Sequence, residues 1–444
     1  MSGYADRPMK RVRVGFVGVG SRGTAAVHRC ALIPGVDVVA ICDNNPERLK
    51  VNREWLLERK FPAPREFGGD FGWKDLCQMD CDVVYAAVPW ELHAPVAKEA
   101  MRCGKHALVE VPAAMTVDEC WDLVETSEKT RRNCMMLENC CYGENELLAL
   151  NMVRKGAFGE IVYGEAGYIH YGTAISRLKK DGDYSWRQKW YQSHVGNIYP
   201  THGLGPVALC MDINRGDQFD YLTSVETGSF GPDAVAGKLY PDKGDWRHAM
   251  HYIMGDVNNS LIRTKNGKSI LLQLNMFNPR KYSRINTIVG TRGVMMDYPL
   301  RIALETELGK GVGEGSEYDP KVTEELREMY RHPLWKVAGE MAQKVGGHGG
   351  MDFIMDLRWI YCLQNGLPLD MDVYDLAAWS CLFEISERSV RGQSMPVDVP
   401  DFTRGAWKSA SPVTIGTVDL VRMGLSGKPV ESDGAQQTVG AGER

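Results

Sequence analysis

The sequence has no long apolar run, and no segment approaches the roughly 18–20 residues of a membrane-spanning helix. It also lacks a strong charge of either sign, because its formal net charge is −5 over 444 residues. We therefore expect no membrane insertion and no general attraction to nucleic acid. The first eleven residues contain no apolar core and do not match a signal peptide. A cytoplasmic location is expected, or an exported one if a leader was removed.

Cysteine is too scarce for a disulfide scaffold. The chain has 12 cysteines, none of them in a CxxC pair. Several, including Cys140 and Cys141, lie in apparent core segments, where the expected role is that of a small buried hydrophobe. No group of Cys and His residues has zinc-ligand spacing, so no metal site is predicted.

A glycine pattern near the N-terminus is the strongest motif present. Residues 13–17 predict a buried strand, and Gly18, Gly20 and Gly23 after it match G-x-G-x-x-G. These glycines suit a tight turn, close approach of a pyrophosphate and close helix packing. The next apolar run ends in Asp43, where a carboxylate would accept hydrogen bonds from ribose hydroxyls and favour NAD over NADP. An ordinary strand–turn–helix with a chance carboxylate is the alternative.

The chain is long enough for at least two domains. Over residues 11–145 short apolar strands alternate with amphipathic helices, which predicts an α/β Rossmann dinucleotide-binding domain. Over residues 146–421 successive strands follow one another without intervening helices, which indicates a C-terminal α/β domain with a large, mostly antiparallel open sheet. Helices are expected in this range over 147–154, 351–364 and 373–390. Residues 1–10 form an N-terminal extension, and residues 422–444 are expected to be a disordered tail.

Candidate catalytic residues are densest around Tyr199 and His202. Their spacing places both side chains on one face of a helical turn. Histidine moves protons near neutral pH, and an adjacent tyrosine can relay them. A capped turn with a buried histidine is the alternative.

Other candidates have equally plain alternatives. Tyr168 on a strand could be a packing residue, and Arg187 between two tryptophans could be a surface arginine instead of a sugar contact. The basic segment 280–284 is expected to be solvated. The glycine-rich segment 346–350 predicts either a loop near the site or a tight start for a helix at Met351.

Several of these segments resemble a known group. The Gly18–Gly23 fingerprint, Asp43, segment 88–93 and the triplet 110–112 resemble the Gfo/Idh/MocA oxidoreductase superfamily. That superfamily pairs a Rossmann domain with an open-sheet α/β domain. Its typical dehydrogenases have a catalytic lysine in a Glu-Lys-Pro triplet, and Val111 stands at that position here.

A more specific resemblance, from about residue 11 to 408, is to the NAD-dependent α-N-acetylgalactosaminidases of glycoside hydrolase family 109. It is carried by segments 136–144, 199–206, 213–217, 346–352 and 400–405. It implies one tightly bound NAD per chain. The NAD contacts that it implies are Ser21, Arg22, Asp43, Trp90, His93, Glu110, Val111, Asn139, Tyr199, Pro200, Thr201 and His202. The sugar contacts that it implies are Tyr168, Arg187, Tyr199 and Tyr282.

The same resemblance implies a redox-neutral glycosidase cycle: oxidation at C3 of the sugar, elimination, addition of water and reduction. His202 with Tyr199 is our candidate for taking the C3 hydroxyl proton, and Tyr168 is our candidate for taking the C2 proton. A tyrosine is a poor base unless a cation such as Arg187 lowers its pKa. The cycle needs no pair of catalytic carboxylates.

Two alternatives stay open. The segment from Tyr171 to Trp186 departs from the family pattern, and its Arg177, Lys179 and Lys180 favour an anionic sugar such as a sulfoquinovoside. The other alternative is a net NAD-dependent sugar dehydrogenase. The expected partner is a small glycoside or a glycan terminus, and a homo-oligomer is expected by analogy.

Overall fold

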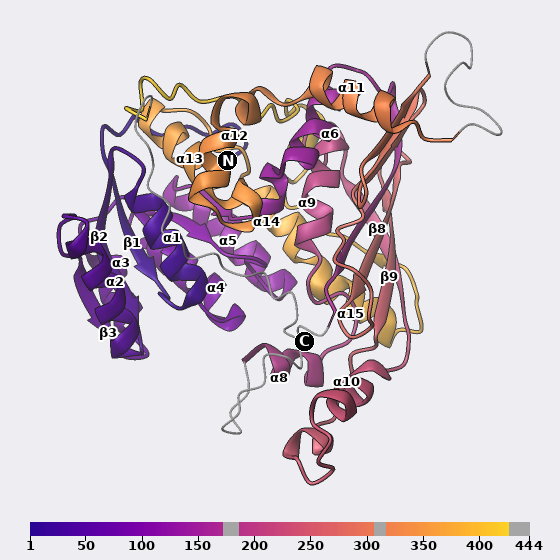
Figure 1. The fold of residues 1–444 in the computed structure, drawn as a ribbon, viewed down its shortest axis with the longest axis horizontal. Helices are drawn as coiled ribbons and strands as arrows, with labels where there is room; N and C mark the ends of the chain where they lie inside the picture. The colour runs from indigo at the N-terminus through magenta and orange to yellow at the C-terminus, as the bar shows by residue number, and fades with distance from the viewer. Residues whose placement is uncertain (172–185, 306–316, 426–444) are drawn as a thin grey trace.

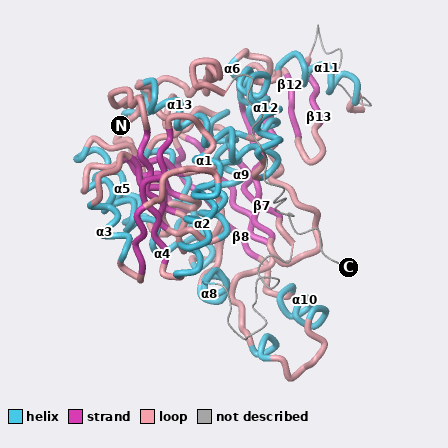
Figure 2. The backbone as a smooth tube through the Cα atoms, turned by 60° about the vertical axis from the view of Figure 1, so that its left-hand side comes forward, coloured by secondary structure: helices cyan, strands magenta, loops and turns pink. Residues whose placement is uncertain are grey.

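The computed structural model describes residues 1–171, 186–305 and 317–425, which form two α/β units side by side (Figure 1). Figure 2 shows their strands as two separate magenta groups with helices between them. No helix in the described ranges is both long enough and apolar enough to span a bilayer.

The first unit is a doubly wound parallel sheet of six strands in the order β3-β2-β1-β4-β5-β6. Its strands are β1 (Val12–Val17), β2 (Val36–Asp43), β3 (Arg65–Gly68), β4 (Val83–Ala86), β5 (His106–Val109) and β6 (Cys134–Met136). Its helices are α1 (Ser21–Ala31), α2 (Pro46–Glu58), α3 (Gly72–Gln78), α4 (Trp90–Arg102) and α5 (Val117–Thr130). The four residues of β4 and the four of β5 are all buried, as expected for strands covered on both faces. The predicted Rossmann fold is confirmed.

The second unit is built on an eight-stranded sheet in the order β13-β12-β11-β7-β10-β9-β8-β14. Its strands are β7 (Ile161–Ile169), β8 (Phe219–Glu226), β9 (Val257–Thr264), β10 (Ser269–Asn275), β11 (Thr287–Gly290), β12 (Gly293–Met296), β13 (Arg301–Leu304) and β14 (Val397–Asp398). Strands β7 and β10 are parallel, and the other pairs are antiparallel. The predicted mostly antiparallel sheet is confirmed.

Helices interrupt this sheet, and here the prediction of uninterrupted strands was wrong. α8 (Trp186–Ser193) and α9 (Thr201–Cys210) separate β7 from β8, and α10 (Gly231–Leu239) separates β8 from β9. Nine of the ten residues of α9 are buried, so it lacks the alternation of polar and apolar faces that identifies a surface helix. The single helix expected over 373–390 is two helices, α14 (Val373–Ser380) and α15 (Leu382–Arg391).

The remaining helices join the two units. α13 (Met351–Asn365), from the C-terminal half, packs on α1 and β1 of the first unit. It follows α12 (Pro333–Val345), while α6 (Glu144–Arg154) and α11 (Pro320–Tyr330) lie nearer the second sheet. The N-terminal extension is ordered: the Met9 N–H donates to the Leu363 carbonyl at 3.0 Å. Of the tail expected to be disordered, residues 426–444 lie outside the described residues.

Candidate active site

A cleft of about 990 Å³ lies at the carboxyl edge of the Rossmann sheet, and residues of both units line it. The predicted site residues found in its lining are Gly18, Gly20, Ser21, Arg22, Asp43, Trp90, His93, Glu110, Val111, Asn139, Tyr168, Arg187, Tyr199 and His202. Gly23, Pro200 and Thr201 are buried, and they are not part of this lining. Tyr282 is 42% exposed, and its ring centre lies 6.3 Å from that of Tyr168.

The glycine turn has the geometry that a dinucleotide requires. Gly18 has φ +83°, and a Cβ there would lie 2.3 Å from the Ala87 carbonyl oxygen. A Cβ on Gly23 would lie 1.8 Å from the Gly18 oxygen, so helix and turn touch through backbone. The same position on Gly20 faces open space, with Arg48 as the nearest group at 3.5 Å. Helix α1 starts at Ser21 with no side-chain cap and no acidic residue in its first turn, which leaves its N–H groups available to an anion.

Asp43 is fixed at the end of β2. Its carboxylate oxygens accept hydrogen bonds from the backbone N–H groups of Val19 and Asn45, each at 2.9 Å. The Arg48 guanidinium lies 3.4 Å away. Together with the glycine turn and the open helix N-terminus, this fixed carboxylate fits the adenosine half of NAD.

We expect Asp43→Asn to weaken discrimination against NADP by roughly tenfold or more. The carboxylate repels a 2′-phosphate, and without it Arg48 can pair with that phosphate. Asparagine keeps the shape and one oxygen acceptor for the turn. Titrating the variant with NAD⁺ and with NADP⁺ gives the ratio of the two dissociation constants. The double variant Asp43→Asn/Arg48→Ala should lose the gain in NADP⁺ affinity. An unchanged ratio would remove Asp43 as the determinant.

Charged groups of both units meet behind the turn. Arg22 pairs with Glu110 and with Asp352, each at 2.6 Å. The Tyr85 hydroxyl also donates to Glu110, at 3.0 Å. Val111 is buried beside Glu110, whose charged partner is Arg22.

Trp90 and His93 form the wall at the start of α4. Both ring nitrogens of His93 face backbone carbonyl oxygens, of Pro112 at 2.6 Å and of Val88 at 2.8 Å. Burial lowers the pKa of His93. The Trp90 ring stacks on Tyr199 with 5.8 Å between centres. Arg187 lies over both rings, 4.9 Å from the centre of Trp90 and 5.2 Å from that of Tyr199.

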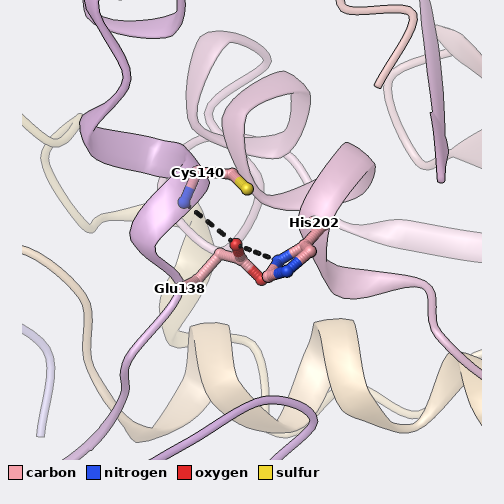
Figure 3. Close-up of side chains that lie close together, drawn as sticks. All are labelled: Glu138, Cys140 and His202. Atoms are coloured by element: carbon pink, nitrogen blue, oxygen red, sulfur yellow. Dashed lines mark hydrogen bonds and ion pairs between the residues drawn. The ribbon is translucent and has the colours of Figure 1, made fainter. Parts of the chain in front are cut away.

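Tyr199 and His202 meet at the start of α9, as their spacing predicted. The Tyr199 hydroxyl lies 3.3 Å from Nε2 of His202. Nδ1 of His202 lies 2.7 Å from Oε1 of Glu138, which follows β6 (Figure 3). The three side chains form a continuous relay from the protein interior to the cleft.

Glu138 is fully buried and determines which nitrogen of His202 carries the proton. Burial alone would raise the pKa of Glu138, but the contact with His202 outweighs it and holds that pKa below its ordinary value. An ionised Glu138 accepts the Nδ1 proton, which leaves Nε2 as an acceptor facing Tyr199. Sequence analysis gave Glu138 no role. A carboxylate directly after a buried apolar strand was the available signal.

Cys140 lies beside this pair, and one ligand atom each from Glu138, Cys140 and His202 fall within 4.8 Å of one another (Figure 3). Oε1 of Glu138 accepts hydrogen bonds from both the Cys140 N–H and His202. Burial raises the pKa of the Cys140 thiol well above its ordinary value. The contacts are those of a hydrogen-bonded array that orients His202.

We expect Glu138→Gln to lower kcat by roughly 100-fold. The amide cannot stabilise a protonated His202 by charge, and it can present its NH₂ group to Nδ1 and favour the wrong tautomer. Cys140→Ala keeps the backbone donor and should retain activity close to that of the unaltered enzyme. Steady-state kinetics on both variants checks this. Equal losses of kcat in the two variants would instead indicate that Glu138 and Cys140 bind a common metal ion.

An aromatic wall from β7 faces the relay. The Tyr168 ring centre lies 4.7 Å from Tyr199 and 5.3 Å from His202. Arg284 donates to the Tyr282 hydroxyl at 2.9 Å and pairs with Glu146. Arg284 is only 6% exposed, so the prediction that all of segment 280–284 is solvated was wrong for this residue. The predicted Arg177, Lys179 and Lys180 lie outside the described residues.

Comparisons with known proteins give a consistent result. Residues 12–138 match the model of the oxidoreductase family with an NAD-binding Rossmann fold, and residues 142–409 match the C-terminal domain model of glycosyl hydrolase 109. The chain is 46% identical over 412 residues to a glycosyl hydrolase family 109 protein of Shewanella pealeana. It is 49% identical over 411 residues to family 109 protein 2 of Shewanella sp. strain ANA-3. Each alignment covers 92% of this chain and 89% of the relative.

Solved structures share the fold at low identity. Levoglucosan dehydrogenase in complex with NADH and levoglucosan superposes with a TM-score of 0.65 at 20% identity, covering 88% of this chain and all of that one. An oxidoreductase domain protein from Kribbella flavida gives a TM-score of 0.68 at 17% identity, again over 88% of this chain and all of its own. These similarities establish the architecture alone.

Proposed function

The chain belongs to glycosyl hydrolase family 109, and we propose that it hydrolyses terminal α-N-acetylgalactosamine, or a related glycoside, by an NAD-dependent redox-neutral route. One observation carries the proposal. The Glu138–His202–Tyr199 relay lines the same cleft as the dinucleotide turn, while Val111 stands where a dehydrogenase has its lysine. The cleft thus offers a proton acceptor and a cofactor site together.

The glycine turn, the N-terminus of α1 and Asp43 would hold the cofactor. Bound NAD⁺ supplies the removal of hydride from C3 of the sugar and its later return. Because the cycle has no net redox change, the cofactor stays with the chain, and we propose one tightly bound NAD per protein.

Oxidation at C3 needs a group that accepts the hydroxyl proton. Nε2 of His202 receives it through the Tyr199 hydroxyl, which lies 3.3 Å away. Burial raises the pKa of Tyr199 well above its ordinary value, so Tyr199 passes the proton on without resting as a tyrosinate. The carboxylate of Glu138 stabilises the protonated His202 that results.

The ketone formed at C3 acidifies the proton on C2. Tyr168, beside Tyr199 and facing the cleft, accepts that proton as the bond from C1 to the leaving group breaks. The charge of Arg187 interacts with Tyr168. A cation beside a tyrosine stabilises a tyrosinate, which is the form that can accept a proton. Water then adds at C1 and C2 is reprotonated, so the atoms balance as a hydrolysis.

One hydrogen-bond donor without a partner favours a second substrate, an anionic sugar such as a sulfoquinovoside. Arg187 lines the cleft and is partly buried, and its buried Nε atom has no hydrogen-bond partner in the described part of the chain. A sulfonate would supply that partner.

The decisive assay uses p-nitrophenyl α-N-acetylgalactosaminide without added cofactor, in D₂O. Steady nitrophenol release with no net NADH, and one non-exchangeable deuterium at C2 of the released sugar, is the expected result. Nitrophenol release without deuterium at C2 would rule out the elimination route. NADH accumulation from free sugar and added NAD⁺, without nitrophenol, would identify a net dehydrogenase. The sulfoquinovoside analogue, assayed in parallel, tests the second substrate.

A further inference from the structure

The glycine-rich segment 346–350 has an unusual backbone. All five residues have positive φ: +88° at Gly346, +87° at Gly347, +46° at His348, +73° at Gly349 and +101° at Gly350. Glycine adopts this region without strain, whereas histidine enters it at a cost. Strain of this kind concentrates at functional sites because the surrounding structure must maintain it.

The segment is held tightly between α12 and α13. A Cβ on Gly347 would lie 2.7 Å from Cβ of Asp352, and one on Gly350 would lie 2.8 Å from the Ala342 carbonyl carbon. Only glycine fits at these two positions, so the segment packs closely on its neighbours. This packing fixes the position of His348, the only residue of the segment that has a side chain. That side chain, His348, lines the cleft and is 46% exposed.

His348 contacts Asp352, the carboxylate that pairs with Arg22 of helix α1. Its Nδ1 lies 2.9 Å from Oδ2 of Asp352, and the same oxygen accepts from Arg22 at 2.6 Å. Arg22 is the second residue of α1, so the imidazole stands beside the helix N-terminus where a diphosphate binds. Asn139 donates to the other oxygen of Asp352 at 2.6 Å and completes the link between the units.

The charges around Asp352 leave room for a further hydrogen-bond donor to a bound phosphate. Burial would raise the pKa of Asp352, but Arg22 and Arg29 outweigh it and hold that pKa well below its ordinary value. The charge of Arg22 is thus shared between two carboxylates, Glu110 and Asp352, before any phosphate binds. With Nδ1 of His348 donating to Asp352, its Nε2 is left without a hydrogen-bond partner among the residues that the structure describes.

We propose that His348 is a cofactor-binding residue, whose Nε2 donates a hydrogen bond to the diphosphate of NAD. Both units thereby contact the cofactor: the first through the glycine turn and the second through His348. Asp352 orients the imidazole by accepting a hydrogen bond from its Nδ1, and a negative diphosphate is a suitable acceptor for a donor at Nε2. This inference deepens the proposed function and rests on its use of a retained NAD.

The test compares the unaltered protein with His348→Asn and with a control, His251→Asn, at an exposed histidine outside the cleft lining. Asparagine tolerates positive φ, so the loop keeps its conformation. Full-length protein is stripped of cofactor and titrated with NAD⁺, ADP-ribose and adenosine, with binding measured by calorimetry. Loss of one charge-assisted hydrogen bond should raise Kd for NAD⁺ and ADP-ribose roughly 10- to 100-fold. Adenosine, which has no phosphate, should bind equally to all three proteins.

Each outcome decides the matter. Equal Kd values for NAD⁺ in His348→Asn and the unaltered protein would overturn the proposal, as would an equal weakening of adenosine, because that would show a displaced loop. A lower melting temperature of the stripped variant would assign His348 a structural role instead. If the unaltered protein releases NAD readily during purification, the retained cofactor of the proposed function fails, while the ratio of Kd values still tests His348.

Discussion

Replacing His202 by alanine is expected to lower kcat by roughly 10²- to 10⁴-fold while the content of bound NAD stays unchanged. His202 is the general base of the proposed relay. Its Nδ1 is occupied by Glu138, and its Nε2 faces the Tyr199 hydroxyl. Without it, the C3 hydroxyl proton has no acceptor inside a largely buried site, and oxidation becomes the slow step.

Single-turnover spectroscopy identifies the step that is lost. In His202→Ala the transient absorbance of NADH should rise more slowly, and substrate deuterated at C3 should show a larger isotope effect than with the unaltered enzyme. His194→Ala is a suitable control, because His194 pairs with Glu387 on α15 and does not line the cleft. Retention of most of the activity in His202→Ala would remove His202 from the proton path.

Local patterns in the sequence were enough to predict the Rossmann half. A strand, a glycine turn and a helix start follow one another directly in the chain, so spacing alone defines the turn around Gly18. The same is true of Tyr199 and His202, which are three residues apart and do meet. Helix α9 was not predicted as a full helix because it is buried nearly all round and contains Gly203, Gly205 and Pro206.

Contacts between distant residues explain what sequence analysis could not supply. Glu138 and His202 are 64 positions apart, and Arg22 and Asp352 are 330 apart. Which carboxylate reaches which base depends on how the two units pack, and no spacing rule encodes that packing. The glycines of 346–350 announced an unusual backbone, and both interpretations of the segment hold: a loop lines the cleft, and α13 starts at Met351.

The packing of α9 on the sheet leads to the largest expected effect on stability. A Cβ added at Gly203 would lie 2.3 Å from the Gly167 nitrogen and 2.5 Å from its oxygen, both backbone atoms of β7. Gly167 is itself confined, since a Cβ there would meet the Ile285 side chain at 2.7 Å. Neither element can rotate a side chain away, so helix and strand must separate. Gly203→Ala should lower the free energy of unfolding by about 3 kcal/mol, near the upper end for overpacking.

The same displacement should reach the chemistry, because His202 directly precedes Gly203 in α9. A shift of about 1 Å in a positioned catalytic group can cost roughly 100-fold in rate, so the folded fraction of Gly203→Ala should also lose activity. Gly237→Ala is the matched control: it lies in helix α10, and its added Cβ would meet nothing within 4 Å. Alanine there should be neutral or stabilising by up to about 1 kcal/mol. Urea unfolding and kcat are measured on both variants. The comparison distinguishes the effect of the close contact at Gly203 from the general effect of replacing a helical glycine by alanine. Equal stability of the two variants would mean that α9 does not rest on the Gly167 backbone.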